Sequence, residues 1–484
     1  MLAHTARRLG SKAAIILGEQ TITYAELAGT SNKVANALLQ AGLRKGDRVG
    51  LLLNNSLELV SLFLGTIKAG GIAVGLDTRY RLDELDSVLG SCRPRFLTAE
   101  SPTLEYILPA LARFPYVEQI ISLDPGYRGR GLIYEDVIRA SSAAEPGVAL
   151  SEDDIATITY TSGPSTHPHG AMFSHRCLSA EAACSAAGFA QTERDIVMLY
   201  ALPLHHMFGQ TTVLLTCLYQ GSTIVMVPGT GISINTLMES IEKHRGTILL
   251  GVPYIFALAI KMAKREGIKH DLSSLRFCGS GGAPLPVETI LEFKRHFGMA
   301  LGDLWGLTEA VSQVTCQPPD GSGKIGSCGI VLPGWQVKIV DGAGNELAVN
   351  QPGEILVKGH FTRGYYNDPE ATAKVITDGW LHTGDLGRID EDGYVYITGR
   401  KKRMIILKGQ NIYPDDVETV IKTHPKVADV RVTGLPDELR GEIVKAVIYL
   451  KPGEECEEAE IRRFCYERMA DYKTPKIMVF EKSA

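Results

Sequence analysis

Hydrophobic residues in the first hundred positions follow two alternating spacings. Short, nearly unbroken apolar runs are typical of buried strands. These runs are Ala13–Leu17, Arg48–Leu53 and Ile72–Leu76. Between them, a capping-box pattern at Thr23-Tyr24-Ala25-Glu26 begins a predicted helix that ends at about Ala41, and a second helix is predicted from Ser56 to Lys68. Strands and helices that alternate at this spacing predict a parallel, doubly wound sheet.

The same alternation of strands and helices returns between Ile155 and Pro286, and a different sequence pattern follows it. Two of the predicted strands there are Ser222–Val227 and Ile248–Val252. From about Lys324, short β runs with glycine turns dominate, which predicts a smaller β-rich unit. Its predicted strands include Gln336–Val340, Gly353–Lys358 and Tyr394–Thr398.

A basic run, Arg400-Lys401-Lys402-Arg403, separates this unit from the last part of the chain. The apolar run Met404–Leu407 follows it, and then a predicted helix, two strands and a helix. The predicted fold class is therefore α/β: a large N-terminal domain of doubly wound sheets with a β-rich unit, residues 1–399, followed by a small α+β domain, residues 400–484.

Composition narrows the class of protein. Lys and Arg number 50 against 55 Asp and Glu, a net charge of −5, so no basic excess favours nucleic acid. Hydrophobic residues (45%) and charged residues (22%) have the balance of an ordinary soluble globular protein. The most apolar later stretch, Ile196 to Val227, is broken by Pro203, two histidines and glycines, which argues against stable membrane association.

Cysteine usage and the N-terminus bear on the compartment. Nine cysteines without a CxxC pair indicate a reducing compartment, and we expect a cytoplasmic protein. The first residues carry Arg7, Arg8 and Lys12 but no apolar core of a secretory signal. We interpret them as an amphipathic helix that leads into the strand at Ala13–Leu17. A homodimer is a candidate assembly, on which the sequence is silent.

Several familiar active-site motifs are absent. Gly321-Ser322-Gly323-Lys324 lacks the leading glycine and the following hydroxyl residue of a P-loop. Gly279-Ser280-Gly281 is not a dinucleotide fingerprint, because Pro284 stands at its last position. GxSxG and HExxH do not occur. Kinase, dehydrogenase, serine hydrolase and zinc protease activities are therefore unsupported.

One loop, between a predicted buried strand and a helix, has the composition of a phosphate cradle. It reads Tyr160-Thr161-Ser162-Gly163-Pro164-Ser165-Thr166-His167-Pro168-His169-Gly170. Hydroxyl groups and bare backbone N–H groups at the end of a strand suit a polyphosphate. Taken alone, such a run is usually only a loop.

Further motifs follow this loop in a fixed order. They are Leu202-Pro203-Leu204-His205-His206-Met207-Phe208-Gly209, Gly281-Gly282-Ala283-Pro284-Leu285, Trp305-Gly306-Leu307-Thr308-Glu309, Trp380-Leu381-His382-Thr383-Gly384-Asp385 and Gly399-Arg400-Lys401-Lys402. In order and approximate spacing, the set resembles the adenylate-forming superfamily of acyl- and aryl-CoA ligases, luciferases and peptide-synthetase adenylation domains. The resemblance runs from about Thr21 to Phe480. Each residue could be an ordinary structural residue by itself, but their joint order favours the family.

The resemblance implies an ATP site. The residues it assigns to ATP are Thr161, Ser162, Gly163, Ser165, Thr166, His169, Gly282, Ala283, Asp303, Trp305, Gly306, Thr308, Asp385 and Arg400. Within this set Trp305, at the usual tyrosine position, would stack on adenine and Asp303 would accept from its amino group. Asp385 would accept from the ribose hydroxyls, and Arg400 would donate to ribose or phosphate. Glu309, with Thr161 nearby, would hold Mg²⁺, which prefers oxygen ligands.

The same resemblance implies sites for a carboxylic acid and for coenzyme A. The acid pocket would comprise His206, Met207, Phe208, Tyr254, Ser280 and Gly281. The acid would first become an acyl-adenylate with release of pyrophosphate. The C-terminal domain would then rotate about Lys402 and bring Lys408, Gly409 and Gln410 to the site for thioester formation. His206, Glu309 and Lys402 are the residues expected to carry catalysis. The apolar candidates suggest an aliphatic or aromatic acid.

Two departures from the family pattern stand out. Where the family loop carries a lysine, this chain has His169, and an imidazole is mostly uncharged at neutral pH. Pro164 also removes a backbone donor from the loop. The family's C-terminal catalytic lysine should follow Pro475-Lys476-Ile477-Met478-Val479-Phe480, but the sequence stops at Ala484, which favours a missing tail.

Three functions remain open. The leading hypothesis is an ATP-dependent acid–CoA ligase that uses ATP, Mg²⁺ and coenzyme A. The first alternative is an adenylating enzyme that loads a carrier-protein pantetheine. The second is a non-catalytic relative that binds a nucleotide or acyl-CoA, which both departures would fit.

Overall fold

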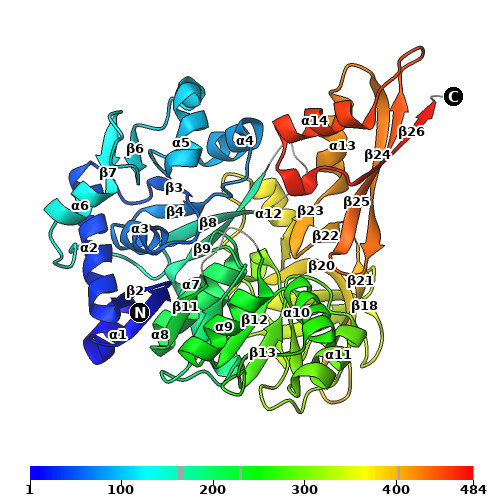
Figure 1. Ribbon diagram of the computed structural model, residues 1–484, viewed down its shortest axis with the longest axis horizontal. Coiled ribbons are helices and arrows are strands. Elements are labelled where there is room, and N and C mark those ends of the chain that lie inside the picture. Colours follow the sequence, from blue (N-terminus) through cyan, green and yellow to red (C-terminus); the bar gives the residue numbers. More distant parts are fainter. Residues whose placement is uncertain (162–167, 228–231, 402–403, 483–484) are drawn as a thin grey trace.

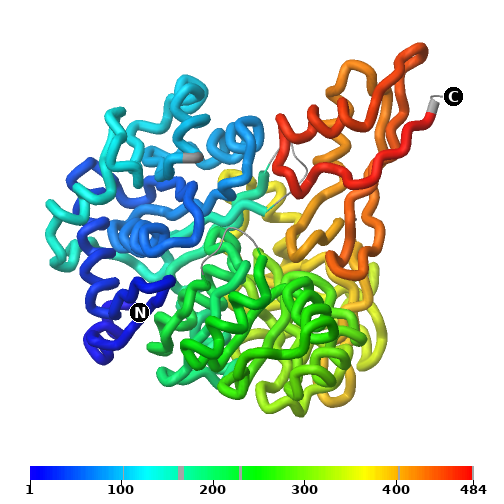
Figure 2. The backbone as a smooth tube through the Cα atoms, in the orientation of Figure 1, coloured from blue at the N-terminus to red at the C-terminus, as the bar shows by residue number. Residues whose placement is uncertain are grey.

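The computed structural model describes residues 1–161, 168–227, 232–401 and 404–482. Figure 1 shows two α/β layers side by side and a smaller unit at one corner, where the C-terminus lies. The tube in Figure 2 follows the chain from the N-terminal layer (blue to cyan) through the second layer (green) to that corner (red). No helix within the described ranges has the length and apolar character that crossing a membrane requires.

The first layer is a seven-stranded sheet. Its spatial order is β7 (Gly131–Ile133), β6 (Gln119–Ser122), β5 (Phe96–Ala99), β3 (Arg48–Leu52), β4 (Ile72–Gly75), β8 (Ile155–Thr161) and β9 (His169–Ser174). All neighbours are parallel except β8 and β9. Its helices are α2 (Tyr24–Gln40), α3 (Leu57–Lys68), α4 (Leu82–Cys92), α5 (Ser101–Ile107), η1 (Leu108–Arg113) and α6 (Tyr134–Ala140). The predicted capping box is confirmed: Thr23 accepts from the Glu26 backbone and Glu26 accepts from Thr23.

The second layer is a nine-stranded sheet. Its order is β16 (Ile330–Val331), β15 (Thr315–Cys316), β14 (Leu301–Trp305), β13 (Phe277–Ser280), β12 (Ile248–Gly251), β10 (Ile196–Leu199), β11 (Thr223–Met226), β1 (Ala13–Leu17) and β2 (Gln20–Thr23). Strands β14, β13, β12, β10, β11 and β1 are parallel. The helices are α1 (Leu2–Leu9), α7 (His175–Gly188), η2 (Phe208–Leu215), α8 (Thr216–Gln220), α9 (Ile234–His244), α10 (Pro253–Glu266), α11 (Val287–Phe297) and η3 (Thr308–Ala310).

Two features correct the sequence prediction of a parallel first sheet. The strand β1 leaves its sequence neighbours and pairs with β11, with Ile15 opposite Ile224. The strand β9 runs antiparallel to β8, because only seven residues separate Thr161 from His169, too few for the crossover that a parallel pair requires. The predicted N-terminal helix is confirmed as α1.

The β-rich unit and the C-terminal part follow. The unit contains β17 (Gln336–Val340), β18 (Gly353–Lys358), α12 (Pro369–Val375), β19 (Ile376–Thr377), β20 (Trp380–Ile389) and β21 (Val395–Arg400). The C-terminal part contains β22 (Ile405–Leu407), β23 (Gln410–Ile412), α13 (Pro414–Lys422), β24 (Val427–Asp437), β25 (Gly441–Leu450), α14 (Glu458–Arg468), η4 (Asp471–Lys473) and β26 (Ile477–Lys482). The final strand β26, parallel to β25, follows the helix at which the predicted order of elements ended.

The C-terminal part has a hydrophobic core of its own. One cluster that draws on residues 405–480 alone buries Val430, Val432, Val444, Ile448 and Ile461.

All nine cysteines lie in described residues and are free thiols, and Cys456 alone is partly exposed. The eight buried thiols therefore fill space as small apolar groups.

Candidate active site

The candidate residues gather at the carboxyl ends of four parallel strands. In the sheet register, Gly251 lies opposite Ser280, and Ser280 lies opposite Asp303. The segment that follows β10 carries His205 and His206. Ligands of open α/β sheets bind at this edge, outside the carboxyl ends of the strands. The topology thus brings together residues of neighbouring strands that the sequence separates by 23 positions or more.

Trp305 and Asp385 join this edge to the β-rich unit. The indole Nε1 of Trp305 donates a hydrogen bond of 2.9 Å to Asp385 Oδ2. Arg400, directly opposite Asp385 in the β20–β21 pair, places its Nε 2.5 Å from Oδ1. Burial raises the pKa of Asp385, while Arg400 and Trp305 act in the opposite direction. The result is a carboxylate that is 1% exposed and held by two donors.

Asp303, on β14, has fewer polar partners than Asp385. Cys328 Sγ donates to its Oδ2 at 3.5 Å. Burial raises the pKa of Asp303 to about 8, so this carboxyl is mostly protonated at neutral pH. A protonated carboxyl offers one donor and retains acceptor capacity, unlike an ionised one.

Glu309 sits in a tightly closed loop after Trp305. A side chain at Gly306 would clash with the Ser312 carbonyl, so this position requires glycine. The short helix η3 begins at Thr308, and the loop continues through Val311 with a left-handed φ of 62°. The Tyr365 hydroxyl donates to Glu309 Oε1 at 2.8 Å, and the Thr362 N–H donates to the Glu309 carbonyl at 2.7 Å. The loop is therefore fixed from the β-rich side.

The phosphate-loop prediction falls largely outside the described residues. This applies to Ser162, Gly163, Ser165 and Thr166. Thr161 ends β8 and its hydroxyl donates to the His169 carbonyl at 3.4 Å. The imidazole of His169 has its Nδ1 3.1 Å from Asp368 Oδ2 and its ring 4.9 Å from the Tyr365 ring. Tyr365 thus contacts both His169 and Glu309.

The predicted acid pocket brings together some of its members. An added side-chain carbon at Gly281 would lie 3.5 Å from Phe208 Cζ and 3.3 Å from Leu304 Cβ. Ser280 is fully buried, and its Oγ has no hydrogen-bond partner among the residues that the structure describes. Gly282, after β13, has a left-handed φ of 78°, and the half-buried Ala283 follows it.

The two histidines directly precede Met207 and Phe208 in the segment that follows β10. The rings of His205 and His206 are 4.9 Å apart, and His206 is exposed. Desolvation by the surrounding protein lowers the pKa of His206 below its ordinary value. Met207 is buried against β8, where its sulfur accepts from the Thr159 hydroxyl at 3.1 Å.

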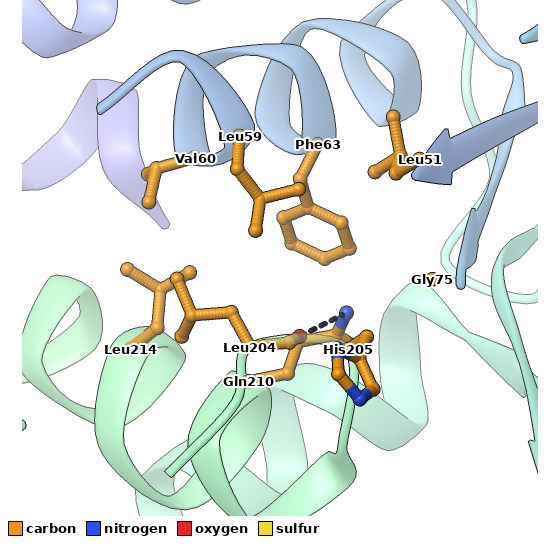
Figure 3. Close-up of a pocket in the computed structure, with 9 residues that line it drawn as sticks. All are labelled: Leu51, Leu59, Val60, Phe63, Gly75, Leu204, His205, Gln210 and Leu214. Atoms are coloured by element: carbon orange, nitrogen blue, oxygen red, sulfur yellow. Dashed lines mark hydrogen bonds between the residues drawn. The ribbon is translucent and has the colours of Figure 1, made fainter. Parts of the chain in front are cut away.

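A small apolar cavity lies behind His205 (Figure 3). It is lined by Leu51, Leu59, Val60, Phe63, Gly75, Leu204, His205, Gln210 and Leu214. Its volume of about 10 Å³ is room for one water molecule and excludes an acyl chain. His205 Nε2 lies 3.7 Å from Asp77 Oδ2, and Gln210 Oε1 is buried without a hydrogen-bond partner among the described residues.

The turn between β22 and β23 docks against the end of β12. Lys408 and Gly409 form it with φ of 53° and 81°, the two positive values of a two-residue hairpin turn. Lys408 Nζ lies 4.8 Å from the centre of the Tyr254 ring. A side chain at Gly409 would clash with Val252. The predicted coenzyme A segment therefore reaches the same edge as Ser280 and Trp305, whereas Lys402 lies outside the described residues.

Comparison with known proteins bears on the whole chain. The family model of AMP-binding enzymes matches residues 2–366, and that of the AMP-binding enzyme C-terminal domain matches residues 416–483. The chain belongs to the AMP-binding enzyme family. It is an AMP-forming acid–CoA ligase, which uses ATP to activate a carboxylic acid and transfers the acyl group to coenzyme A.

Curated relatives and solved structures agree with this assignment. A long-chain-fatty-acid–CoA ligase of Bacillus subtilis is 33% identical over 100% of this chain and 90% of its own length. A 4-coumarate-CoA ligase of Narcissus pseudonarcissus is 33% identical over 94% of this chain and 84% of its own length. The o-succinylbenzoate CoA synthetase of Bacillus subtilis, bound with a product analogue, superposes with a TM-score of 0.88 at 29% identity, covering 99% of this chain and 94% of that one. ATP-bound MatB of Rhodopseudomonas palustris superposes with a TM-score of 0.75 at 32% identity, covering 99% of this chain and 94% of that one.

Residues outside the family motifs also contact the candidate site. Tyr365 holds Glu309, and the pair Asp77–Arg79 lies beside His205. No local sequence signal marks either of them, because each acts through a partner that is distant along the chain.

Proposed function

We propose that one site at the edge of the nine-stranded sheet carries both half-reactions, with an apolar carboxylic acid as the substrate. The observation that supports this most directly is the contact of the Lys408–Gly409 turn with Val252 and Tyr254. That contact puts the C-terminal part beside the strands that bear Ser280 and Trp305. The proposed domains are residues 1–399 and 400–484, with Lys402 as the pivot between them.

In the first half-reaction, a carboxylate oxygen attacks the α-phosphorus of ATP, and the bond to pyrophosphate breaks. Trp305 and Asp303 would hold adenine, and Asp385 with Arg400 would hold the ribose. The hydroxyl and backbone groups of 161–166, with His169, would hold the phosphates. Binding and orientation account for most of the catalysis in such a step.

Glu309 is the residue we assign to Mg²⁺. Tyr365 engages Oε1, and the hydrogen bonds of the described residues include none to Oε2. A carboxylate oxygen is a ligand that Mg²⁺ prefers, so this residue fits the ion. Bound there, the ion would neutralise phosphate charge, while the chain's own residues hold the nucleotide.

The chemistry of the pocket favours an apolar acid. Phe208, Leu304 and Val252 surround the glycines 281 and 282. Lys408, a cation near these glycines, lies over Tyr254 and belongs to the C-terminal turn. The relatives named above act, by name, on long-chain fatty acids and 4-coumarate. We therefore favour aliphatic or aromatic acids over small dicarboxylic acids.

In the second half-reaction, the thiol sulfur of coenzyme A attacks the acyl carbonyl, and the bond from that carbon to AMP breaks. The turn at Lys408, Gly409 and Gln410 would flank the arm that carries the thiol. A backbone without a side chain at Gly409 allows this close approach.

The free cysteines are consistent with a reducing, cytoplasmic location.

The test is pyrophosphate exchange into ATP with a panel of carboxylic acids. Exchange should depend on the acid, and medium-chain or cinnamate-like acids should exceed malonate. Acid-independent exchange, or none with any acid, would favour a binding protein without this activity. AMP release with coenzyme A against a pantetheinylated carrier protein separates the two possible acceptors.

Gly409→Ala distinguishes the two half-reactions. The added methyl group meets Val252, and the left-handed φ disfavours alanine. Thioester formation should fall while pyrophosphate exchange persists. The matched control is Gly379→Ala, which has a similar φ of 75° but open space around it, at the turn between β19 and β20.

A further inference from the structure

The C-terminal part also touches the first layer, next to the contact that the Lys408–Gly409 turn makes with the second layer. Figure 1 shows α14 beside α4, and the residues after α14 reach the segment between β4 and α4. Charged and aromatic side chains from both parts meet there. The two parts are far apart in the sequence, so these contacts exist only while the C-terminal part is docked.

The first contact is an ion pair. Lys473 Nζ lies 2.5 Å from Glu84 Oε1, and the two side chains are only 12% and 14% exposed. Burial alone would lower the pKa of Lys473, but Glu84 and Tyr80 outweigh it and raise that pKa. Glu84 keeps its other oxygen on the Arg81 N–H at the start of α4. An ion pair shielded from water contributes more to stability than an exposed pair. If one partner is removed, the charge of the other stays in a place where water solvates it poorly.

The second contact is made by Arg79. Two hydrogen bonds of 2.9 and 2.6 Å from its guanidinium to buried Asp77 fix its orientation. Its guanidinium carbon lies 4.6 Å from the centre of the Tyr472 ring. With the Gln410 amide turned to present its oxygen, that oxygen accepts from Arg79 at 2.5 and 2.7 Å. One arginine therefore holds both η4 and the residue that follows Gly409.

We propose that Glu84–Lys473 and Arg79–Tyr472 form a polar latch that holds the C-terminal part in the orientation for thioester formation. The latch and the docked Gly409 turn occur together, and Gln410 contacts Arg79 directly. The structure also superposes better on the relative with a coenzyme A product analogue than on the ATP-bound relative, although the latter is more similar in sequence. Rotation for adenylation would separate Lys473 from Glu84. Arg79 and Lys473 are thus positioning residues for the second half-reaction.

The inference rests on the two half-reactions proposed above, so its test measures each of them. Glu84→Lys, Lys473→Glu and the doubly swapped protein are compared in two assays. One follows acid-dependent pyrophosphate release without coenzyme A. The other follows a single turnover of preformed acyl-adenylate with coenzyme A. If wild type releases no pyrophosphate with any acid, the proposed function fails, whatever the latch does.

Each single reversal should slow thioester formation by at least about tenfold, the change that 1.4 kcal/mol produces. Pyrophosphate release should stay within about twofold, and the double swap should recover most of the thioester rate, since it restores opposite charges. Lys422→Glu is the matched control, because its 2.8 Å pair with Asp429 lies within the C-terminal part. It should leave both assays unchanged.

Three outcomes would overturn the latch: equal loss in both assays, no loss in either, or a double swap as slow as the single variants. Should a reversal fail to fold, Arg79→Lys and Lys473→Met provide the second route. They remove the guanidinium contacts or the charge without introducing a repelling group. The same selective loss of thioester formation is expected from both, and its absence would contradict the latch.

Discussion

Trp305 donates a 2.9 Å hydrogen bond from its indole nitrogen to Oδ2 of Asp385, and both side chains are buried. The residue expected to stack on adenine therefore also holds the residue expected to bind the ribose. A tyrosine, usual at this position in the resemblance described above, has no indole N–H to offer. This contact links the two halves of the nucleoside site.

The first prediction follows from removing that donor. Trp305→Phe keeps an aromatic face but leaves Asp385 with Arg400 alone. Losing a hydrogen bond to a charged acceptor should cost about 1.5 kcal/mol, a rise of about tenfold in the KM for ATP. Discrimination against 2′-deoxy-ATP should fall as well. The control is Trp335→Phe, at a buried tryptophan that packs on His360. Equal effects of the two substitutions on KM would show that the contact does not serve ATP.

The second prediction concerns Asp303 and pH. Its raised pKa of about 8 means that the protonated form, which can donate as well as accept, dominates at neutral pH. The KM for ATP should therefore rise as the pH rises through about 8. Asp303→Asn, which keeps a donor and an acceptor at every pH, should flatten this rise. A wild-type profile that is already flat up to pH 9 would contradict the role.

The same pKa predicts a trend in stability. Between the ordinary aspartate value of 3.8 and about 8, the native state holds a proton at Asp303 that the unfolded state has lost. Stability should fall as pH rises through this window, because the unfolded state binds fewer protons there. Asp303→Asn should weaken that slope in urea titrations. A slope equal to that of wild type would assign the trend to other groups.

The third prediction concerns His169, which lies near Asp368 and Tyr365. If it replaces the family lysine at the phosphates, a lysine charge at this position should strengthen ATP binding, and removal of the ring should weaken it. His169→Lys retains a partner in Asp368 and should lower the KM for ATP at neutral pH, whereas His169→Ala should raise it. Equal KM values for the three proteins would mean that His169 does not act on phosphate.

The fourth prediction concerns a buried ion pair beneath the Glu309 loop. Glu181 is fully buried; its Oε2 lies 2.8 Å from His360 Nε2, and its Oε1 accepts from the Gln313 N–H. Burial raises the pKa of Glu181, and the contact with His360 partly offsets this. His360→Leu removes the partner and should cost about 3–5 kcal/mol in the free energy of unfolding.

A surface pair provides the comparison for that variant. His270 lies 2.8 Å from Glu242, which is 44% exposed. His270→Leu should cost less than about 1 kcal/mol, since an exposed pair contributes little. If both histidine variants lose the same stability in urea titrations, the Glu181–His360 pair contributes no more to the free energy of unfolding than a surface pair does.

The sequence predicted local elements better than their partners. Ala13–Leu17 and Gln336–Val340 have the predicted bounds, because an apolar run between turn residues marks a strand directly. That β1 lies against β11 could not be read, since pairing Ile15 with Ile224 depends on the whole fold. Register between distant strands leaves no local pattern.

The candidate site shows the same limit. The family order of the motifs predicts Glu309, Trp305 and Asp385 as site residues, and this stays a prediction. Tyr365, which holds Glu309, and Lys473, which meets Glu84 from 389 positions away, lie outside those motifs. Such residues act through a partner in space. The sequence therefore indicates the chemistry of the site but not the contacts that orient it.

The central claim, acid activation at the Trp305–Asp385 site, is tested most directly by acid-dependent pyrophosphate exchange in wild type and Asp385→Ala. Removing this buried carboxylate should raise the KM for ATP by a factor that corresponds to about 2–4 kcal/mol. The maximal rate with the best acid should change much less. An Asp385→Ala protein with the wild-type KM for ATP would contradict the account.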